Sequence, residues 1–176
     1  MTLTHRIATL DDEPKLKELM RLSIQDLQID FLTPEQIEAS HDCMGLDTQL
    51  IKDQTYFIIE DDGEIAGCGG WSNRQTLFGA SHSTGRDDSF IDPAKDPARI
   101  RATYTHPNFA RRGVGKLIMK LCEGIAREKG FKSTVLAATL AGEKLFTSCG
   151  YKPIERFEAT SNKGVEVPMV RMGKKL

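Results

Sequence analysis

The 176-residue sequence lacks the features that mark several specialised classes of protein. It has no apolar run near the roughly 18 residues needed to cross a bilayer, and its first ten residues lack the apolar stretch of a signal peptide. Its four cysteines, Cys43, Cys68, Cys122 and Cys149, form no CxxC or other metal-ligand spacing. We therefore expect a cytoplasmic protein with reduced cysteines and no bound metal.

Charge of one sign is also missing. The 24 basic residues nearly balance the 25 acidic ones, for a formal net charge of −1. This balance predicts no general affinity for nucleic acid or for an anionic membrane surface. Hydrophobic residues make up 39% and charged residues 28%, as in ordinary globular proteins. We expect one domain over residues 1–176, and the sequence leaves its oligomeric state open, a homodimer included.

Periodicity and turn signals predict alternating strands and helices. Helices are expected after Asp12, from Thr33, from Val114 to Gly130, and over residues 143–149. The predicted strands cover residues 3–8, 56–60, 64–71, 99–105, 133–138, 151–157 and 165–172. The order β-α-α-β-β-β-α-β-α-β-β predicts an α/β (α+β) fold with a mixed sheet.

The segment after the strand at 99–105 combines a Gly-x-Gly turn with the start of an amphipathic helix. Gly113 and Gly115 would let a ligand approach the backbone, and the first N–H groups of a helix have no partner within the helix. Arg111, Arg112 and Lys116 add positive charge at the same point. This combination predicts a pyrophosphate site. The alternative is a tight turn with solvated arginines.

Two familiar phosphate motifs do not fit this segment. A Rossmann dinucleotide site would need a third glycine at position 118, which is isoleucine. The G-x-x-x-x-G-K-[ST] pattern of a phosphate-binding loop is absent from the sequence. A dinucleotide or nucleoside-triphosphate site of those types is therefore not expected.

The wider pattern resembles the acyl-CoA-binding motif of the GNAT superfamily of N-acetyltransferases. After the strand come His106-Pro107, Ala110-Arg111-Arg112-Gly113-Val114-Gly115, and an amphipathic helix that ends at Gly130. Further on, Leu145-Phe146-Thr147-Ser148-Cys149-Gly150-Tyr151 is similar to the closing motif of that superfamily. The resemblance implies a mixed, mostly antiparallel sheet flanked by helices, with a splayed pair of strands that holds acetyl-CoA.

The resemblance also implies residue roles. The pantetheine arm would lie between the strands at 99–105 and 133–138, paired with backbone groups of Thr103 and Thr105. An N–H near Thr103 or Tyr104 would polarise the thioester carbonyl, which makes these two residues the catalytic candidates. The pyrophosphate would lie on the N–H groups of residues 111–116, which include Val114.

Three positions depart from the pattern of the superfamily. Ala110 stands where Gln or Arg is usual, and Thr139 stands where Asn is frequent, although Thr139 can still bond the arm. Phe146 stands where a tyrosine commonly protonates the departing thiolate. A general base is not evident either, because the strand at 99–105 has no carboxylate. For each candidate base, a solvated side chain is the alternative interpretation: Glu60, Glu64, His82, Asp87, Asp88 and His106.

The sequence thus predicts an N-acetyltransferase that moves the acetyl group of acetyl-CoA to a small-molecule amine, such as an amino acid, a polyamine or an amine drug, by direct attack. The alternative is a non-catalytic acyl-CoA-binding or sensor module. A protein acetyltransferase would need a groove for an extended peptide. The candidate acceptor contacts are Trp71 and Arg101. The alternatives are that Trp71 packs in the core and that Arg101 forms an ion pair. We expect residues 72–98 to form much of the acceptor site, with a mobile surface loop as the alternative.

Overall fold

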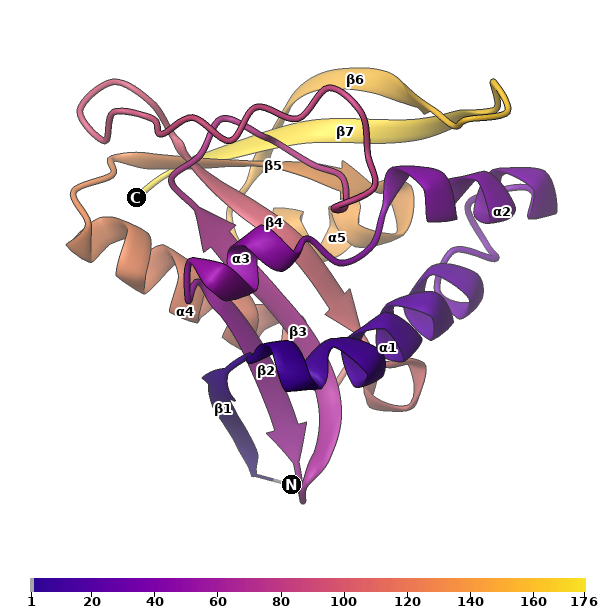
Figure 1. The fold of residues 1–176 in the computed structure, drawn as a ribbon, viewed down its shortest axis with the longest axis horizontal. Coiled ribbons are helices and arrows are strands. Elements are labelled where there is room, and N and C mark those ends of the chain that lie inside the picture. The colour runs from indigo at the N-terminus through magenta and orange to yellow at the C-terminus, as the bar shows by residue number, and fades with distance from the viewer. Residues whose placement is uncertain (1) are drawn as a thin grey trace.

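One seven-stranded sheet organises the chain in the computed structural model, which describes residues 2–176 (Figure 1). Its strand order is β1-β2-β3-β4-β5-β7-β6, and only the β4–β5 pair is parallel. This confirms the predicted mixed, mostly antiparallel sheet. The strands are β1 (Leu3–Ile7), β2 (Tyr56–Asp61), β3 (Glu64–Ser72), β4 (Ala98–Thr105), β5 (Ser133–Thr139), β6 (Lys152–Thr160) and β7 (Glu166–Lys175).

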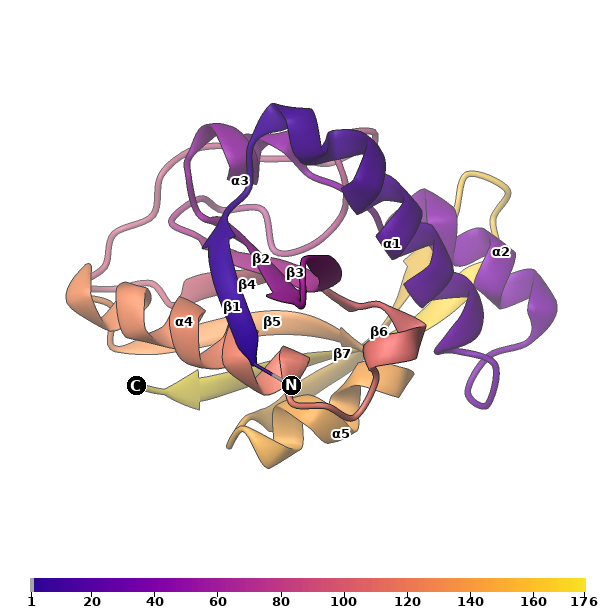
Figure 2. The ribbon, with the colours of Figure 1, turned by 90° about the horizontal axis from the view of Figure 1, so that it is seen from below.

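Helices cover both faces of this sheet. The helices α1 and α3 lie on one side, and α4 and α5 lie on the other (Figure 2). The helices are α1 (Glu13–Asp26), α2 (Pro34–Cys43), α3 (Thr48–Lys52), α4 (Val114–Glu128) and α5 (Leu140–Ser148), with short 3-10 turns at Leu10–Asp12 and Pro107–Phe109. The predicted start of the second helix at Thr33 is confirmed, because its hydroxyl accepts the Gln36 N–H at 3.2 Å.

The short helix α3 was not among the sequence predictions. Five residues are too few to produce a helical hydrophobic period. The local signal was Asp47, whose carboxylate accepts the Gln49 N–H at 3.0 Å and caps the helix.

Glycines in β3 bring α4 close to the sheet. A side chain at Gly69 would place its Cβ 2.6 Å from Ile118 Cγ2, and one at Gly67 would collide with Val114. These absent side chains let α4 pack against β3 at short range. The start of α4 is thereby held beside the end of β4.

The two parallel strands separate soon after they meet. Within the described residues, β4 and β5 pair only at Ala98 with Thr134 and at Arg99 with Val135. From Ile100 onward the strands diverge, which confirms the predicted splay. Beyond this pair of contacts, the facing edges of β4 and β5 have no strand pairing with each other.

The long segment from 73 to 97 is folded back on the body of the protein. Arg74 forms an ion pair with Asp53 at 2.6 Å, and its guanidinium lies 4.2 Å from the centre of the Phe90 ring. Arg86 forms an ion pair with Asp47 at 2.9 Å. The two arginines of this segment therefore hold it against the rest of the protein.

Candidate active site

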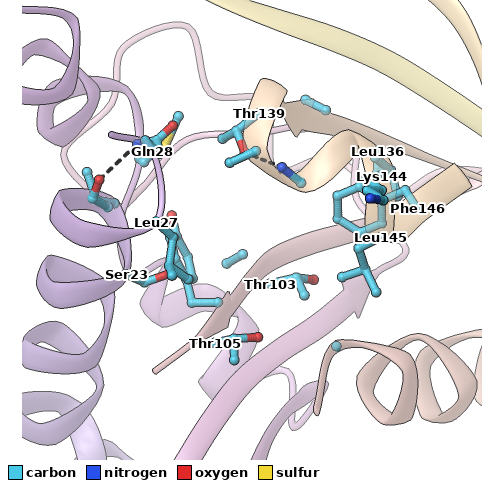
Figure 3. Close-up of a pocket in the computed structure, with 18 of the residues that line it drawn as sticks. Ser23, Leu27, Gln28, Thr103, Thr105, Leu136, Thr139, Lys144, Leu145 and Phe146 are labelled. Atoms are coloured by element: carbon cyan, nitrogen blue, oxygen red, sulfur yellow. Dashed lines mark hydrogen bonds between the residues drawn. The ribbon is translucent and has the colours of Figure 1, made fainter. Parts of the chain in front are cut away.

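A cleft of about 680 Å³ opens in the gap between β4 and β5 and continues to α1 (Figure 3). Its central part is lined by Ile100, residues 102–105 of β4, and Leu136, Ala137 and Thr139 of β5. One end is formed by the start of α4 and by α5. The other end, which we call the acceptor wall, is formed by Ser23, Ile24, Leu27, Gln28, Phe31, Cys43, Met44, Leu77, Phe78 and Gly79.

The start of α4 has the geometry of an anion site. Arg111 and Gly113 both have left-handed backbone conformations, with φ of 66° and 88°. Alternation of this kind turns successive N–H groups toward one point, and the helix dipole adds positive potential there. Arg111 and Lys116 line the cleft here, while Arg112 lies outside the lining with its guanidinium 5.3 Å from the Phe109 ring centre.

The two glycines of this turn differ in role. A Cβ at Gly113 would meet nothing within 4 Å, so this position faces open space. A Cβ at Gly115 would lie 2.5 Å from Leu145 Cδ2. Gly113 therefore permits close approach of a ligand, whereas Gly115 permits close packing of α4 on α5, a role that the sequence analysis did not assign to it.

A β-bulge interrupts β4 beside the gap. Cys68 pairs with Tyr104 and Gly70 pairs with Arg101, so Ala102 and Thr103 together face Gly69. Ala102 has a φ of 50°, which is strained for a residue with a side chain. A bulge leaves one residue out of the strand ladder, so its backbone groups can take partners other than the neighbouring strand.

The hydroxyl of Tyr56 holds this bulge in position. It donates to the Ala102 carbonyl oxygen at 2.6 Å. Burial raises the pKa of Tyr56 well above its usual value, so the phenol stays protonated and remains a donor. The sequence analysis found neither the bulge nor this contact, because Tyr56 and Ala102 are distant in the chain.

The predicted arm-binding residues meet in the cleft. Thr103, Thr105, Thr139 and Phe146 all line it. The Thr103 hydroxyl oxygen is buried and has no hydrogen-bond partner in residues 2–176. The Thr139 hydroxyl caps α5 by accepting the Gly142 N–H at 3.0 Å, which leaves its own proton available to donate.

Tyr104 also lines the cleft. Its hydroxyl oxygen accepts the Gly45 N–H at 2.9 Å. Burial raises the pKa of the Tyr104 phenol above its ordinary value, so the group stays protonated. Its O–H is a proton donor within the cleft wall, whereas Phe146 supplies only a ring, 6.2 Å from the Tyr151 ring centre.

Two predicted acceptor contacts lie elsewhere. Trp71 is 4% exposed, stands edge-on to Phe131 in the core, and is not part of the lining. Arg101 is 3% exposed and forms an ion pair with Asp47 at 2.9 Å. The expectation that Arg101 faces the cleft is thus corrected, because a buried guanidinium takes the nearest buried carboxylate.

None of the six candidate bases lines the cleft. Among the described residues that line the cleft there is no Asp, Glu or His. Glu60 accepts from Arg6 at 3.0 Å and Asp88 from Arg86 at 2.9 Å. His106 Nδ1 accepts the Asn108 N–H at 3.2 Å, so His106 shapes the turn after β4.

The thiols show no sign of reactivity. All four cysteines are free, and Cys43 lines the cleft. Burial raises the pKa of the Cys43 thiol above its usual value and that of Cys68 to about 12. A protonated thiol is a weaker nucleophile than a thiolate, so the burial of Cys43 favours direct attack over an acyl-enzyme on this residue.

Residues 2–176 contain no group of three or more His, Cys, Asp or Glu side chains placed to hold a metal ion. No helix in this part of the chain combines the length and the apolar character that crossing a membrane requires.

Comparison with known proteins places the chain in a family. Residues 17–151 match the Acetyltransferase (GNAT) family, and the chain therefore belongs to it. No curated protein sequence matches the chain.

Solved structures share the fold over the full length. A GCN5-related N-acetyltransferase from Rhodopseudomonas palustris covers 100% of this chain and 97% of its own, with a TM-score of 0.74 and 20% identity. PaiA N-acetyltransferase from Thermoplasma acidophilum, solved in complex with coenzyme A, covers 100% of both chains with a TM-score of 0.66 and 15% identity. YncA from Salmonella typhimurium, solved with acetyl-CoA, covers 100% of this chain and 95% of its own, with a TM-score of 0.63 and 15% identity.

Proposed function

We propose that the protein transfers the acetyl group of acetyl-CoA to the amine of a small molecule by direct attack. The observation that carries the proposal is the single cleft, which has an anion site at the start of α4, a bulged strand at its centre and an apolar wall at its far end. These three parts of the cleft, in this order, suit the pyrophosphate of a ligand, its amide-containing arm with the thioester, and a second reactant.

Each part of the cleft has a proposed role. The N–H groups of residues 111–116 bind the pyrophosphate, with Arg111 and Lys116 beside it. Backbone groups of Thr103 and Thr105 pair with the pantetheine arm, and Thr139 donates to it. A backbone N–H at the bulge, near Thr103 or Tyr104, polarises the thioester carbonyl. Holding both reactants in one cleft supplies much of the rate acceleration.

The lining also bears on the state of the amine. An apolar environment disfavours the ammonium form, so the acceptor is bound as the neutral, nucleophilic amine. Because no carboxylate or histidine belongs to the described lining, the proton passes to water outside the cleft. For the departing thiolate, Tyr104 is the phenol that lines the cleft, and a thiol of pKa about 8.5 is already a fair leaving group.

A tyrosine at position 146 should speed the departure of the thiolate. Phe146 lines the cleft and is 7% exposed, so a hydroxyl on this ring would lie at the cleft wall. We expect Phe146→Tyr to raise kcat about 10-fold, within the roughly 100-fold range of a general acid, with little change in coenzyme A affinity. Steady-state kinetics and calorimetry measure the two quantities.

The matched control is Phe90→Tyr, which adds the same hydroxyl to a side chain that is 67% exposed and lies outside the lining. It should leave kcat unchanged. An unchanged kcat in Phe146→Tyr would mean that Tyr104 alone suffices as the donor, and a lower kcat would mean that the Phe146 ring is needed for packing.

A non-catalytic acyl-CoA-binding or sensor module is the second candidate. The features that favour it are Phe146 in place of a tyrosine and a lining without a base. Incubation with acetyl-CoA and a panel of amines, read by release of the coenzyme A thiol, separates the two. Release that depends on the amine supports the transferase. Tight binding of coenzyme A with no release for any amine supports the sensor.

A further inference from the structure

The acceptor wall is almost entirely apolar. Of its side chains, only those of Ser23 and Gln28 carry oxygen or nitrogen. The loop between β3 and β4 contributes Leu77, Phe78 and Gly79, while its arginines are paired with aspartates away from the cleft. The loop thus supplies part of the acceptor wall, through apolar contacts and without the mixed charge that would suit an amino acid.

The charged side chains of the cleft come from the side of α4 and α5, and one of them, Lys144, also lies with Phe31 and Glu143 in a smaller adjoining pocket. They are Arg111, Lys116 and Lys144, from the turn before α4, from α4 and from α5. Figure 3 shows Lys144 beside Phe146, across the cleft from Ser23, Leu27 and Gln28. An acceptor whose carboxylate or second ammonium group lay against Leu27, Leu77 and Phe78 would bury that charge against carbon, which is strongly unfavourable.

Gln28 carries a buried acceptor atom without a donor. The side chain is 4% exposed, and its Nε2 donates to the Ile24 carbonyl oxygen at 3.2 Å. Because a carbonyl oxygen can only accept, this bond fixes which end of the amide is nitrogen. The remaining Oε1 is buried and has no hydrogen-bond partner anywhere in residues 2–176. Unsatisfied buried acceptors are uncommon in native proteins and point to a missing donor.

We propose that the acceptor is a hydrophobic primary amine, alkyl or arylalkyl, without a carboxylate or a second charge. Its apolar body packs against Ile24, Leu27, Met44, Leu77 and Phe78, and its amine N–H donates to Gln28 Oε1. A neutral amide oxygen suits a neutral amine, whereas a carboxylate would favour the unreactive ammonium form. The inference rests on the proposed function and specifies its substrate class.

The transfer step is balanced without a further reactant. The nitrogen lone pair forms the new C–N bond while the C–S bond of the thioester breaks, and the sulfur leaves with the electron pair of that bond. The nitrogen loses one proton to water and the thiolate takes up one proton. The products are the N-acetyl amide and the free thiol of coenzyme A.

A matched pair of acceptors tests the substrate class. Phenethylamine and phenylalanine have the same aromatic body, and phenylalanine adds a carboxylate. We expect kcat/KM for phenethylamine to exceed that for phenylalanine at least about 100-fold, because the carboxylate would be buried without a partner. Equal or greater activity with phenylalanine, or with a diamine, would overturn the inference and leave the transferase proposal intact. Absence of thiol release with every amine would instead overturn the proposed function.

A matched pair of variants tests Gln28. We expect Gln28→Leu to raise KM for phenethylamine about 10-fold, as loss of one buried hydrogen bond does, with coenzyme A affinity unchanged. Ser40→Ala is the control, because the Ser40 hydroxyl is also buried and donates to the carbonyl of Gln36 four residues back, at 2.8 Å, but lies outside the cleft lining. An unchanged KM in Gln28→Leu, or an equal rise in Ser40→Ala, would contradict the contact.

Discussion

Replacing Gly113 by valine is expected to lower the affinity for coenzyme A about 100-fold. Gly113 has a φ of 88°, and a Cβ there would project into open space beside the start of α4. The valine methyl groups would occupy the volume in which we place the pyrophosphate. Loss of two hydrogen bonds to a charged group, at about 1.5 kcal/mol each, corresponds to about two orders of magnitude in affinity. Isothermal calorimetry with coenzyme A measures it.

The other end of the same helix provides the control. Gly130 has a φ of 89°, and a Cβ there would be 4.0 Å from Pro93, well outside the cleft lining. Gly130→Val therefore introduces nearly the same backbone strain, about 1–2 kcal/mol, without entering the proposed site. It should bind coenzyme A like the unaltered protein. Equal affinity in both variants would remove the assignment of the α4 start to the pyrophosphate.

Removal of the Asp47 carboxylate should be the most destabilising single change in the loop region. Asp47 is 2% exposed and accepts from Arg86 and Arg101, each at 2.9 Å. Asp47→Ala leaves the buried Arg101 guanidinium without a counter-charge. Breaking a buried ion pair in this way costs about 3–5 kcal/mol. We expect this fall in the free energy of unfolding, measured by urea denaturation.

Asp47→Ala should also loosen the loop residues that line the cleft, because Arg101 holds them. Arg101 donates to the carbonyl oxygens of Thr76 at 3.2 Å and Gly79 at 3.1 Å, which flank the cleft residues Leu77 and Phe78. Glu18→Ala is the comparison, since the Glu18–Arg21 pair is about half exposed and should leave the urea midpoint within error of the unaltered value. If Asp47→Ala shifted the urea midpoint no more than Glu18→Ala, the ion pairs of Asp47 with Arg86 and Arg101 would not hold the loop.

Local signals in the sequence were sufficient for the order of the elements apart from α3, and for the half of the cleft to which we assign the cofactor. The capped helix start at Thr33 and the Gly-x-Gly turn before α4 are short-range patterns. The splay of β4 from β5 came from the resemblance to a family, not from any local pattern. Most of the predicted cofactor contacts fall within the single segment 103–116, so their proximity in space follows from their proximity in the chain.

The acceptor half could not be read in the same way. Ile24 and Leu27 belong to an apolar helical stripe, and periodicity does not distinguish a stripe that packs in the core from one that lines a cleft. Their neighbours Leu77 and Phe78 come from a distant loop without regular structure. Arg101 looked like a ligand contact because its partner Asp47 is 54 residues away. Pairing between residues so far apart in the chain produces no local sequence pattern.

The most direct measurement is the fate of the acetyl carbon. The protein would be incubated with acetyl-CoA labelled with carbon-13 at the carbonyl and with an equal amount of phenethylamine, and followed by NMR. Our account predicts that the label moves from the thioester to an N-acetyl amide, with one free thiol formed for each amide. Label that stays on the thioester, or that appears only as free acetate, would contradict acetyl transfer to a hydrophobic amine.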